Sequence, residues 1–301
     1  MTLLLLITAA PFALAEVSAA RIDVVVPPGN NSLLDMAGAI QHALQRQLPE
    51  TPIAVATSDT YNSATNPPAL LIAIGDPLLA WLAQNRTGRA NTIAFNVNSA
   101  LYLTALPRDN RITALYRDQP LPRQLRLAKL LLPNLRQVAI IHSVVPLPQS
   151  AEELQRVSKL TINTANVANL ADWPKQLSIL MRGNDVLLGI DDPQVYNSDN
   201  IRSILLTTYR HGKVLIGPSR AFVNAGSLAS CYTPPDQYLQ QLIDLVATAM
   251  REHRLPAPQY PRNFRVATNP QVAASLGLAI PDEKILTERL QNSSEECGDG
   301  C

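Results

Sequence analysis

The sequence predicts an α/β protein made of two doubly wound parallel-sheet lobes that together form a clamshell. Short apolar runs alternate with amphipathic segments along the chain, which is the pattern of βαβ units. Most of these runs end in a polar loop containing Gly, Pro, Asn or Asp. With 301 residues, the chain is long enough for two domains of ordinary size.

The first lobe is expected to hold βα-type units in doubly wound order. Strands are predicted over 22–26, 52–56, 69–74 and 92–97. A helix should follow the first strand, with Ser32 as its N-cap and an apolar face formed by Leu33, Ala37, Ile40 and Leu44. Asp76 is predicted to cap the helix after the third strand, because Pro77 suits a first helical turn.

A second lobe of similar size is expected from residue 112 onward, after which the chain returns to the first. Its strands are predicted over 112–115, 138–141, 186–190 and 213–217, with helices between them. A long helix should begin at Pro234-Pro235, and a strand over 264–267 should come near the end. The expected boundaries are 1–15 for a signal peptide, 21–111 plus about 228–255 for lobe 1, 112–227 plus about 256–290 for lobe 2, and 291–301 for a flexible tail.

The N-terminus is interpreted as a secretory signal. It is apolar from Thr2 to Ala15 and ends in Ala13-Leu14-Ala15, a small-x-small cleavage pattern. The run is too short to cross a bilayer, and no later segment approaches ~18 apolar residues, so the mature protein is not expected to span a membrane. No Lys or Arg precedes the run, which leaves a buried strand as the alternative. No cysteine follows the cleavage site, which excludes lipid anchoring at that position.

Composition argues against several classes of protein. Charged residues are 16% of the chain and the net charge is +1, which is unlike a nucleic-acid-binding protein. The basic cluster 117–129 alternates with leucines and is interpreted as a solvated helix face. Three cysteines and four histidines are too few and too isolated for a metal site, and no cofactor is expected. Cys231 should be a small buried hydrophobe, while Cys297 and Cys301 either pair locally or lie unpaired in the tail.

Catalytic motifs are absent, so no enzymatic activity is expected. The chain has no G-x-S-x-G elbow, no phosphate-binding loop of the G-x-x-x-x-G-K-[ST] type and no G-x-G-x-x-G. His142 and Ser143 are adjacent at a strand end, where neighbouring side chains point apart, so they predict a loop lining rather than a nucleophile. Asp191 and Asp192 lack a partner acid or base and are interpreted as binding carboxylates.

Ligands of open parallel sheets bind where the carboxyl ends of the strands meet loops, which gives a set of candidate residues. Tyr196 and Tyr232 either stack on a ligand or pack at the seam between the lobes, and Arg220 either pairs with a ligand carboxylate or faces solvent. Because they lie on loops, Asp192→Ala and Tyr196→Ala are expected to weaken binding with little loss of stability. The candidate ligand-binding residues are Gly75, Asp76, Asn98, Ser99, Ser143, Asp191, Asp192, Tyr196, Ser219, Arg220 and Tyr232.

Three stretches, ALYRDQPLPRQLRLAKLLLP (114–133), LLGIDDPQVYNSDNIRSILLTTYRHGKVLIGPSRAFVNAGSLASCY (187–232) and QYPRNFRVATNPQVAASLGLAIPDE (259–283), carry a family resemblance. The chain resembles the solute-binding proteins of ABC transporters in the tryptophan- and tyrosine-binding-like family, which have the class I periplasmic binding protein fold. The resemblance implies that Asp192 stands where the family places a loop Asp. Two loops depart from the family pattern, at 27–32 and at 98–100. The resemblance implies cleft loops that start at Gly75, Asn98, Ser143, Asp191, Ser219 and Tyr232.

The resemblance implies a periplasmic protein of a Gram-negative cell that captures a small organic ligand between its lobes and delivers it to an ABC permease. Two alternatives stay open at this point. The same fold can serve as a sensory or accessory module that reports ligand occupancy to a membrane sensor kinase or an outer-membrane receptor. A two-lobed transferase is the third reading, although the missing catalytic residues argue against it.

Overall fold

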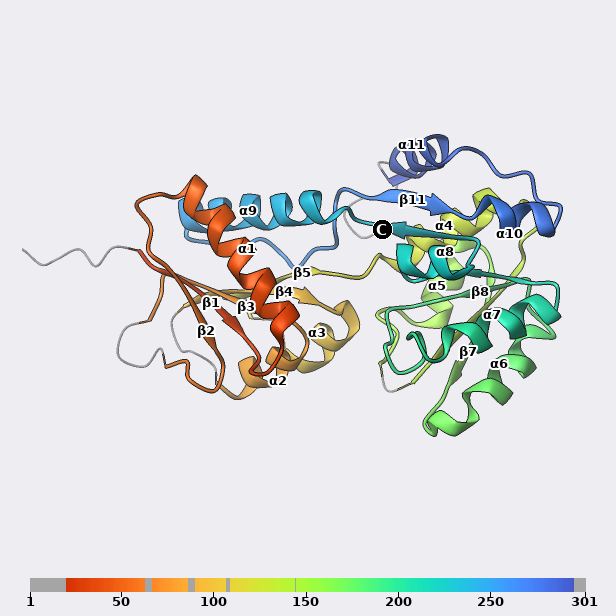
Figure 1. Ribbon diagram of the computed structural model, residues 1–301, viewed down its shortest axis with the longest axis horizontal. Helices are drawn as coiled ribbons and strands as arrows, with labels where there is room; N and C mark the ends of the chain where they lie inside the picture. Colours follow the sequence, from red (N-terminus) through yellow and green to blue (C-terminus); the bar gives the residue numbers. More distant parts are fainter. Residues whose placement is uncertain (1–19, 63–66, 86–89, 107–108, 144, 295–301) are drawn as a thin grey trace, which may run out of the picture.

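The computed structural model describes residues 20–62, 67–85, 90–106, 109–143 and 145–294, and the chain forms two lobes, each built around its own sheet (Figure 1). The signal peptide expected over 1–15 lies outside the described residues, as do Cys297 and Cys301. Within the described residues, no helix combines the length and the apolar character that a membrane span requires.

The first lobe contains a five-stranded parallel sheet in the order β2-β1-β3-β4-β5. The strands β1 and β3 in its interior are fully buried β-branched and leucine-rich runs, as expected for a parallel sheet covered on both faces, whereas the edge strand β2 is largely only half-buried. Its elements are β1 Ile22–Val26, α1 Asn31–Gln47, β2 Ile53–Thr57, β3 Leu70–Ile74, α2 Pro77–Gln84, β4 Asn91–Val97, α3 Ser99–Ala105, β5 Ile112–Tyr116 and, from much later in the chain, α9 Pro235–Glu252.

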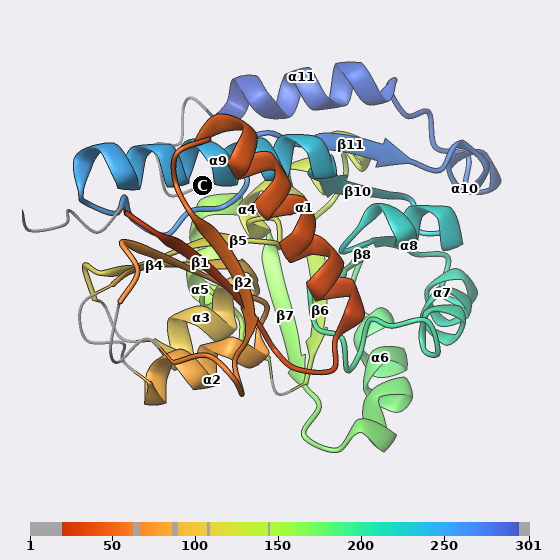
Figure 2. The ribbon, with the colours of Figure 1, turned by 60° about the vertical axis from the view of Figure 1, so that its left-hand side comes forward.

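Helices cover both faces of this sheet. The long helices α1 and α9 lie side by side on one face, where Ile40 and Val246 share a core with Phe95 (Figure 2). On the other face, α2 and α3 pack against the strands through Leu78 and Tyr102. The predicted cap of α1 is wrong: the side chain of Asn30, not Ser32, accepts the backbone N–H of Leu33 at 3.1 Å, because the helix begins at residue 31.

The second lobe contains a six-stranded sheet in the order β11-β10-β9-β8-β6-β7, in which only β11 runs antiparallel. Two rows of helices flank it, α4, α5 and α11 in one row and α6, α7 and α8 in the other. The elements are α4 Leu121–Leu131, β6 Gln137–His142, α5 Ala151–Ser158, β7 Thr161–Asn166, α6 Trp173–Met181, β8 Val186–Leu188, α7 Ile201–Arg210, β9 Val214–Ile216, α8 Arg220–Ala225, β10 Ala229–Tyr232, β11 Arg265–Thr268, α10 Pro270–Ser275 and α11 Glu283–Ser294.

The chain passes between the lobes at residues 117–120, 233–234 and 253–264. The sheets divide the chain differently from the predicted boundaries at two strands: β5 pairs with β4 in the first sheet, and β10 pairs with β9 in the second. The predicted tail also begins too early, because α11 continues to residue 294 and buries Leu286 and Leu290 against the second lobe.

Candidate binding site between the lobes

The two lobes face each other through the carboxyl ends of their strands. In each sheet, the strands next to the point where strand order reverses lie at this interface. In the first sheet the order reverses between β1 and β3, and in the second between β6 and β8. Loops at such switch points leave a crevice beyond the carboxyl ends of the strands, where open α/β sheets bind ligands. Asp76 follows β3 and Asp191 follows β8, so each switch point supplies one carboxylate.

Arg117 joins these two carboxylates. It directly follows β5, and its Nη2 lies 2.7 Å from Asp76 Oδ2 while its Nε lies 2.7 Å from Asp191 Oδ2. Its Nη1 donates to the carbonyl oxygen of Asn96 at 3.3 Å. Burial alone lowers the pKa of Arg117, but the charges and hydrogen bonds of Asp191 and Asp76 outweigh it and raise that pKa above its usual value. The guanidinium is therefore held cationic, with each of its three nitrogens in contact with an oxygen.

Asn98 provides a second link between the lobes. Its Nδ2 donates to the carbonyl oxygen of Asp191 at 3.0 Å and to Oδ2 of the same residue at 3.2 Å. Its Oδ1 accepts from the backbone N–H groups of Ala100 and Leu101 in α3, which fixes the side chain as the cap of that helix. The backbone N–H of Asn98 donates to Asp76 Oδ1 at 2.7 Å. The predicted helix-capping role of Asp76 is wrong, because its carboxylate is used for Asn98 and Arg117 instead.

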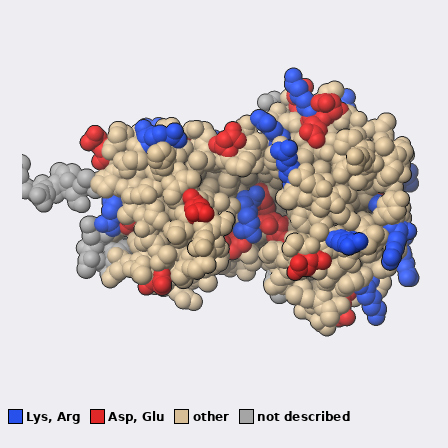
Figure 3. Space-filling model, viewed as in Figure 1, with Lys and Arg blue, Asp and Glu red and all other residues tan. Residues whose placement is uncertain are grey.

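Figure 3 shows Lys or Arg side chains next to Asp or Glu side chains in the constriction between the lobes. A narrow pocket of about 20 Å³ lies between the lobes and is lined from both sides, which is room for about one water molecule while the lobes are in contact. Of the described residues that line it, only Asp118 and Asp191 are ionisable, and none is aromatic. The lining residues are Asn98, Ser99, Ala100, Asp118, Gln119, Leu121 and Gln124 with Val145, Pro146, Pro148, Gly189, Ile190, Asp191 and Pro218.

Asp118 is the carboxylate of this pocket that forms no ion pair with any cation among the described residues. Its oxygens accept from the backbone N–H and the hydroxyl of Ser99 at 2.8 and 2.6 Å. Burial raises the pKa of Asp118 to about 6; the hydrogen bonds from Ser99 act in the opposite direction, and the charge of Asp191 adds to the increase. Tyr260 donates to the Ser99 hydroxyl at 3.1 Å, which ties the site to the segment that links α9 with β11.

Asp192 and Tyr196, two of the candidate residues, are buried inside the second lobe. Asp192 is fully buried and accepts from the backbone N–H of Ser143 at 2.6 Å, from the Ser143 hydroxyl at 2.8 Å and from the N–H of Gln194 at 3.0 Å. Tyr196 packs edge-on against Phe222, and burial raises its pKa. Both residues lie on the loop after β8, as predicted, but they are buried and neither lines the pocket.

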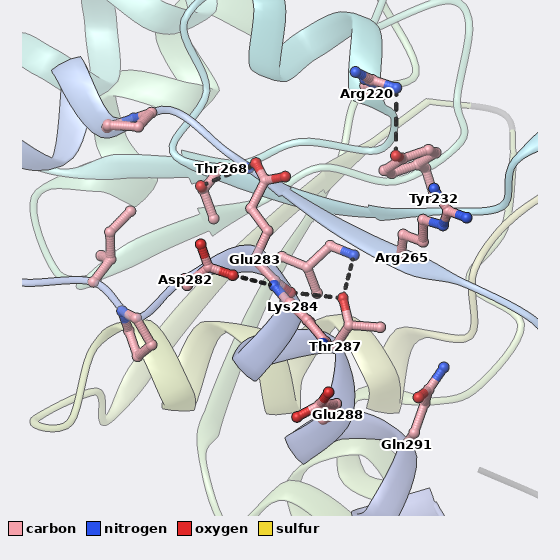
Figure 4. Close-up of a pocket in the computed structure, with 14 residues that line it drawn as sticks. Arg220, Tyr232, Arg265, Thr268, Asp282, Glu283, Lys284, Thr287, Glu288 and Gln291 are labelled. Carbon is pink, nitrogen blue, oxygen red and sulfur yellow. Dashed lines mark hydrogen bonds between the residues drawn. The ribbon is translucent and has the colours of Figure 1, made fainter.

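Arg220 and Tyr232 belong to a different pocket on the second lobe (Figure 4). Arg220 Nη1 donates to the Tyr232 hydroxyl at 3.4 Å, and its guanidinium lies 5.2 Å from the centre of the ring. Residues of β11 and α11, such as Arg265 and Thr287, complete that pocket. Ser219 begins α8 next to Pro218 of the interlobe pocket, without lining it.

Gly75 shapes the turn that presents Asp76. Its φ is +91°, a conformation that residues with a side chain rarely adopt, and a Cβ there would lie 2.9 Å from Leu33 Cδ1. The structure thus brings together Asp76, Asn98, Ser99 and Asp191 of the candidate residues, with Gly75 supporting them.

Sequence reasoning missed Arg117, Asp118, Gln119 and Gln124. The interpretation of 117–129 as a solvated face is wrong, because Arg117 joins the lobes and Arg123 is buried with its guanidinium 4.1 Å from the Phe264 ring centre. Arg117 could have been predicted from the rule that selected the other candidates, because it belongs to a polar loop directly after a buried strand. Within the described residues, no group of His, Cys, Asp and Glu is arranged to hold a metal ion.

Comparison with known proteins supports the fold. No protein-family model matches the chain, and no curated protein matches it. Among solved structures, an ABC domain in complex with L-Trp from Streptococcus pneumoniae is 18% identical and has a TM-score of 0.64, covering 90% of this chain and 98% of its own. A ligand-free, open substrate-binding protein with adhesive properties from Clostridium difficile is 13% identical, with a TM-score of 0.66 and coverage of 88% and 97%.

A periplasmic ribose ABC transporter structure from Conexibacter woesei is 13% identical, with a TM-score of 0.55 and coverage of 90% and 97%. At such identities the likeness concerns the fold alone. The two parallel-sheet lobes and these neighbours together confirm the predicted two-lobed α/β clamshell of the class I periplasmic binding protein type.

Proposed function

We propose that this protein is a periplasmic solute-binding protein that captures a small organic ligand between its lobes and delivers it to an ABC importer. One observation carries the proposal: Asp191 of the second lobe contacts both Asn98 and Arg117 of the first, beside a pocket lined from both lobes. A ligand held there is enclosed from two sides, and interdomain clefts are where most of a small ligand's surface can be buried.

The fold neighbours support this reading. The Streptococcus pneumoniae structure is described as bound to L-Trp, and the Conexibacter woesei structure as a periplasmic ribose ABC transporter. The N-terminal apolar run with its small-x-small ending supports export, and with it a periplasmic location in a Gram-negative cell. An ABC permease is the partner that this function requires.

Native mass spectrometry of the protein purified from the periplasm tests the binding function, together with a thermal-shift screen of the same preparation. A solute at a hundred times its dissociation constant adds about 2.7 kcal/mol to the free energy of unfolding. For a chain of this size that corresponds to a rise in Tm of roughly 5 °C or more. If no solute co-purifies and no metabolite fraction raises the Tm, the protein is not a solute-binding protein.

The importer partnership is tested separately. Purified protein loaded with its solute should stimulate ATP hydrolysis by the permease and ATPase encoded beside it, reconstituted in proteoliposomes. An Asp191→Asn variant serves as the comparison, because it removes the carboxylate that joins the lobes without altering the fold of either lobe. If a sensor kinase or an outer-membrane receptor is encoded there instead and responds to the solute, delivery to an importer is overturned.

A further inference from the structure

The charge balance of the interlobe pocket indicates which kind of ligand it accepts. Asp118 and Asp191 line it and Asp76 lies beside it, and among the described residues the cation paired with these carboxylates is Arg117. Its guanidinium already contacts Asp76, Asp191 and the carbonyl oxygen of Asn96, so its single positive charge is shared by two carboxylates. A carboxylate ligand would therefore meet like charges in a partly desolvated site, which is unfavourable.

The two lining carboxylates have acceptor capacity to spare. Asp191 Oδ2 accepts from Arg117 and Asn98, whereas its Oδ1 has no hydrogen-bond partner among the described residues. Each oxygen of Asp118 accepts one hydrogen bond from Ser99, and a carboxylate oxygen offers about two acceptor positions. A ligand with an ammonium group can donate to both carboxylates, one from each lobe.

Gln124 adds a donor that also lacks a partner. The residue is only 3% exposed, and its Oε1 accepts the backbone N–H of Cys231 at 3.2 Å. That bond fixes the orientation of the amide, so Nε2 is the atom left without a hydrogen bond among the described residues. An amide N–H is a hydrogen-bond donor that a ligand oxygen can accept from. Since Gln124 lines the pocket, a ligand oxygen is the partner that would satisfy it.

Apart from the polar side chains of Asn98, Ser99 and Gln119, the rest of the lining is aliphatic. It includes Leu121 from the first turn of α4 and Ile190 from the loop after β8, with prolines from two further loops. No aromatic ring among the described lining residues is available to stack on an aromatic ligand. The body of the ligand should therefore be aliphatic.

Resting on the proposed function, we propose that this pocket, once the two lobes move apart enough to widen it, binds a small aliphatic organic cation: an amine that also carries a carbonyl or hydroxyl oxygen and has no carboxylate. The ammonium group lies between Asp118 and Asp191, and the ligand oxygen accepts from Gln124 Nε2. Arg117 remains paired with Asp76 and keeps the pocket from becoming more negative still.

Matched sets of compounds test this assignment by thermal shift and calorimetry. Alanine, proline and leucine are each compared with the corresponding amide and amino alcohol, which keep the ammonium group and an oxygen but lack the carboxylate. We expect at least one amide or amino alcohol to bind, and at least tenfold more tightly than its parent amino acid. The assignment is overturned if the amino acids or neutral myo-inositol bind instead, or if none of the cations binds.

Two variants test which residues contact the ammonium group and the oxygen of the ligand. Asp118→Asn removes one charge with little change in shape and should weaken binding of the cation about tenfold or more, whereas binding of a neutral solute would not respond in this way. Gln124→Leu should weaken binding of the amide and of the amino alcohol more than it weakens binding of the simple alkylamine of the same length. Asp244→Asn, on the exposed side of α9, is the control that should leave affinity unchanged. Equal affinity for the cation in the wild type and Asp118→Asn would refute the placement.

Failure of the cation assignment can be told apart from failure of the proposed solute-binding function. A neutral or acidic solute found by native mass spectrometry in the purified protein would overturn the cation assignment and leave solute binding standing. Absence of any co-purifying solute, with no response to metabolite fractions, would overturn both.

Discussion

Replacing Asp191 by asparagine tests whether one carboxylate sets how tightly the lobes are held together. The substitution keeps the shape of the side chain and removes the charge that faces Arg117 at 2.7 Å. Both side chains are about a quarter exposed, 26% and 28%, so solvent screens the pair only in part. A hydrogen bond to a charged partner contributes about 1.5–3 kcal/mol. Taking about 2 kcal/mol, the equilibrium between touching and separated lobes should shift about thirtyfold toward separation.

Single-molecule energy transfer between a dye on each lobe measures this equilibrium. Exposed His42 of α1 and exposed Lys175 of α6 suit the labels as cysteine replacements. Cys297 and Cys301 would be changed to serine, while Cys231 is fully buried and can stay. The population with separated lobes should grow in the variant, and the distance within each lobe should stay the same.

Asp199→Asn is the matched control, because this exposed aspartate lies on the same loop and makes no contact with the first lobe. It should reproduce the wild-type distribution. The hydrogen bond from Asn98 to the carbonyl oxygen of Asp191 survives the substitution, so the change should be partial rather than complete. Indistinguishable distributions for Asp191→Asn and the wild type would refute the idea that this charge holds the lobes together.

Three further predictions concern stability, each measured by urea unfolding. Asp118 binds its proton more tightly in the folded state, so protonation of Asp118 stabilises the fold fully below about pH 4, and this stabilisation is lost as the pH rises through about 6. The free energy of unfolding should fall by at most about 3 kcal/mol over that range. Asp118→Asn should remove this pH dependence, and a pH dependence that persists in the variant would assign it to another group. Asp192→Asn should cost about 2 kcal/mol or more, because it disrupts the buried hydrogen bonds to Ser143; a loss below 0.5 kcal/mol would contradict this. Gly75→Ala should cost about 1–3 kcal/mol from its positive φ and the contact with Leu33, and an unchanged midpoint would show that the turn relaxes freely.

Sequence patterns located the buried strands well, because buried parallel strands are continuous apolar runs bounded by turn residues. They did not locate β7, whose run TINTAN is polar and half exposed, as befits an edge strand with one neighbour. The assignment of β5 and β10 to lobes differed because a strand's composition does not specify which sheet it joins. That choice depends on pairings between residues far apart in the sequence.

The candidate site could be predicted in part. A rule about strand ends was enough to select Asp76, Asn98 and Asp191, which the structure brings together. The same rule also selected Arg220 and Tyr232, which follow strands of the second lobe but line its separate pocket. Which strand end faces the other lobe depends on how the lobes are docked, and local sequence does not record that.

Asp191 and Asp192 show that local sequence also does not specify the direction of a single side chain. Both follow β8, yet one points toward the first lobe and the other into its own lobe, where Ser143 satisfies it. Side chains in an irregular loop follow no fixed period, so the sequence does not say which of the two faces the pocket. Gln124 was missed for a different reason, since it lies on a helix among leucines.

The position of α9 has a consequence for the synthesis of this protein. Its residues Leu242, Ile243 and Val246 complete the core of the first lobe, but they are made about 120 residues after β5, the last strand of that sheet. At ordinary elongation rates of 5–20 residues per second, the ribosome takes roughly 6–24 s to reach α9. During that interval α1 covers only part of this face, and the part that α9 will cover stays exposed, so a nascent chain should depend on chaperones or on rapid secretion to avoid aggregation.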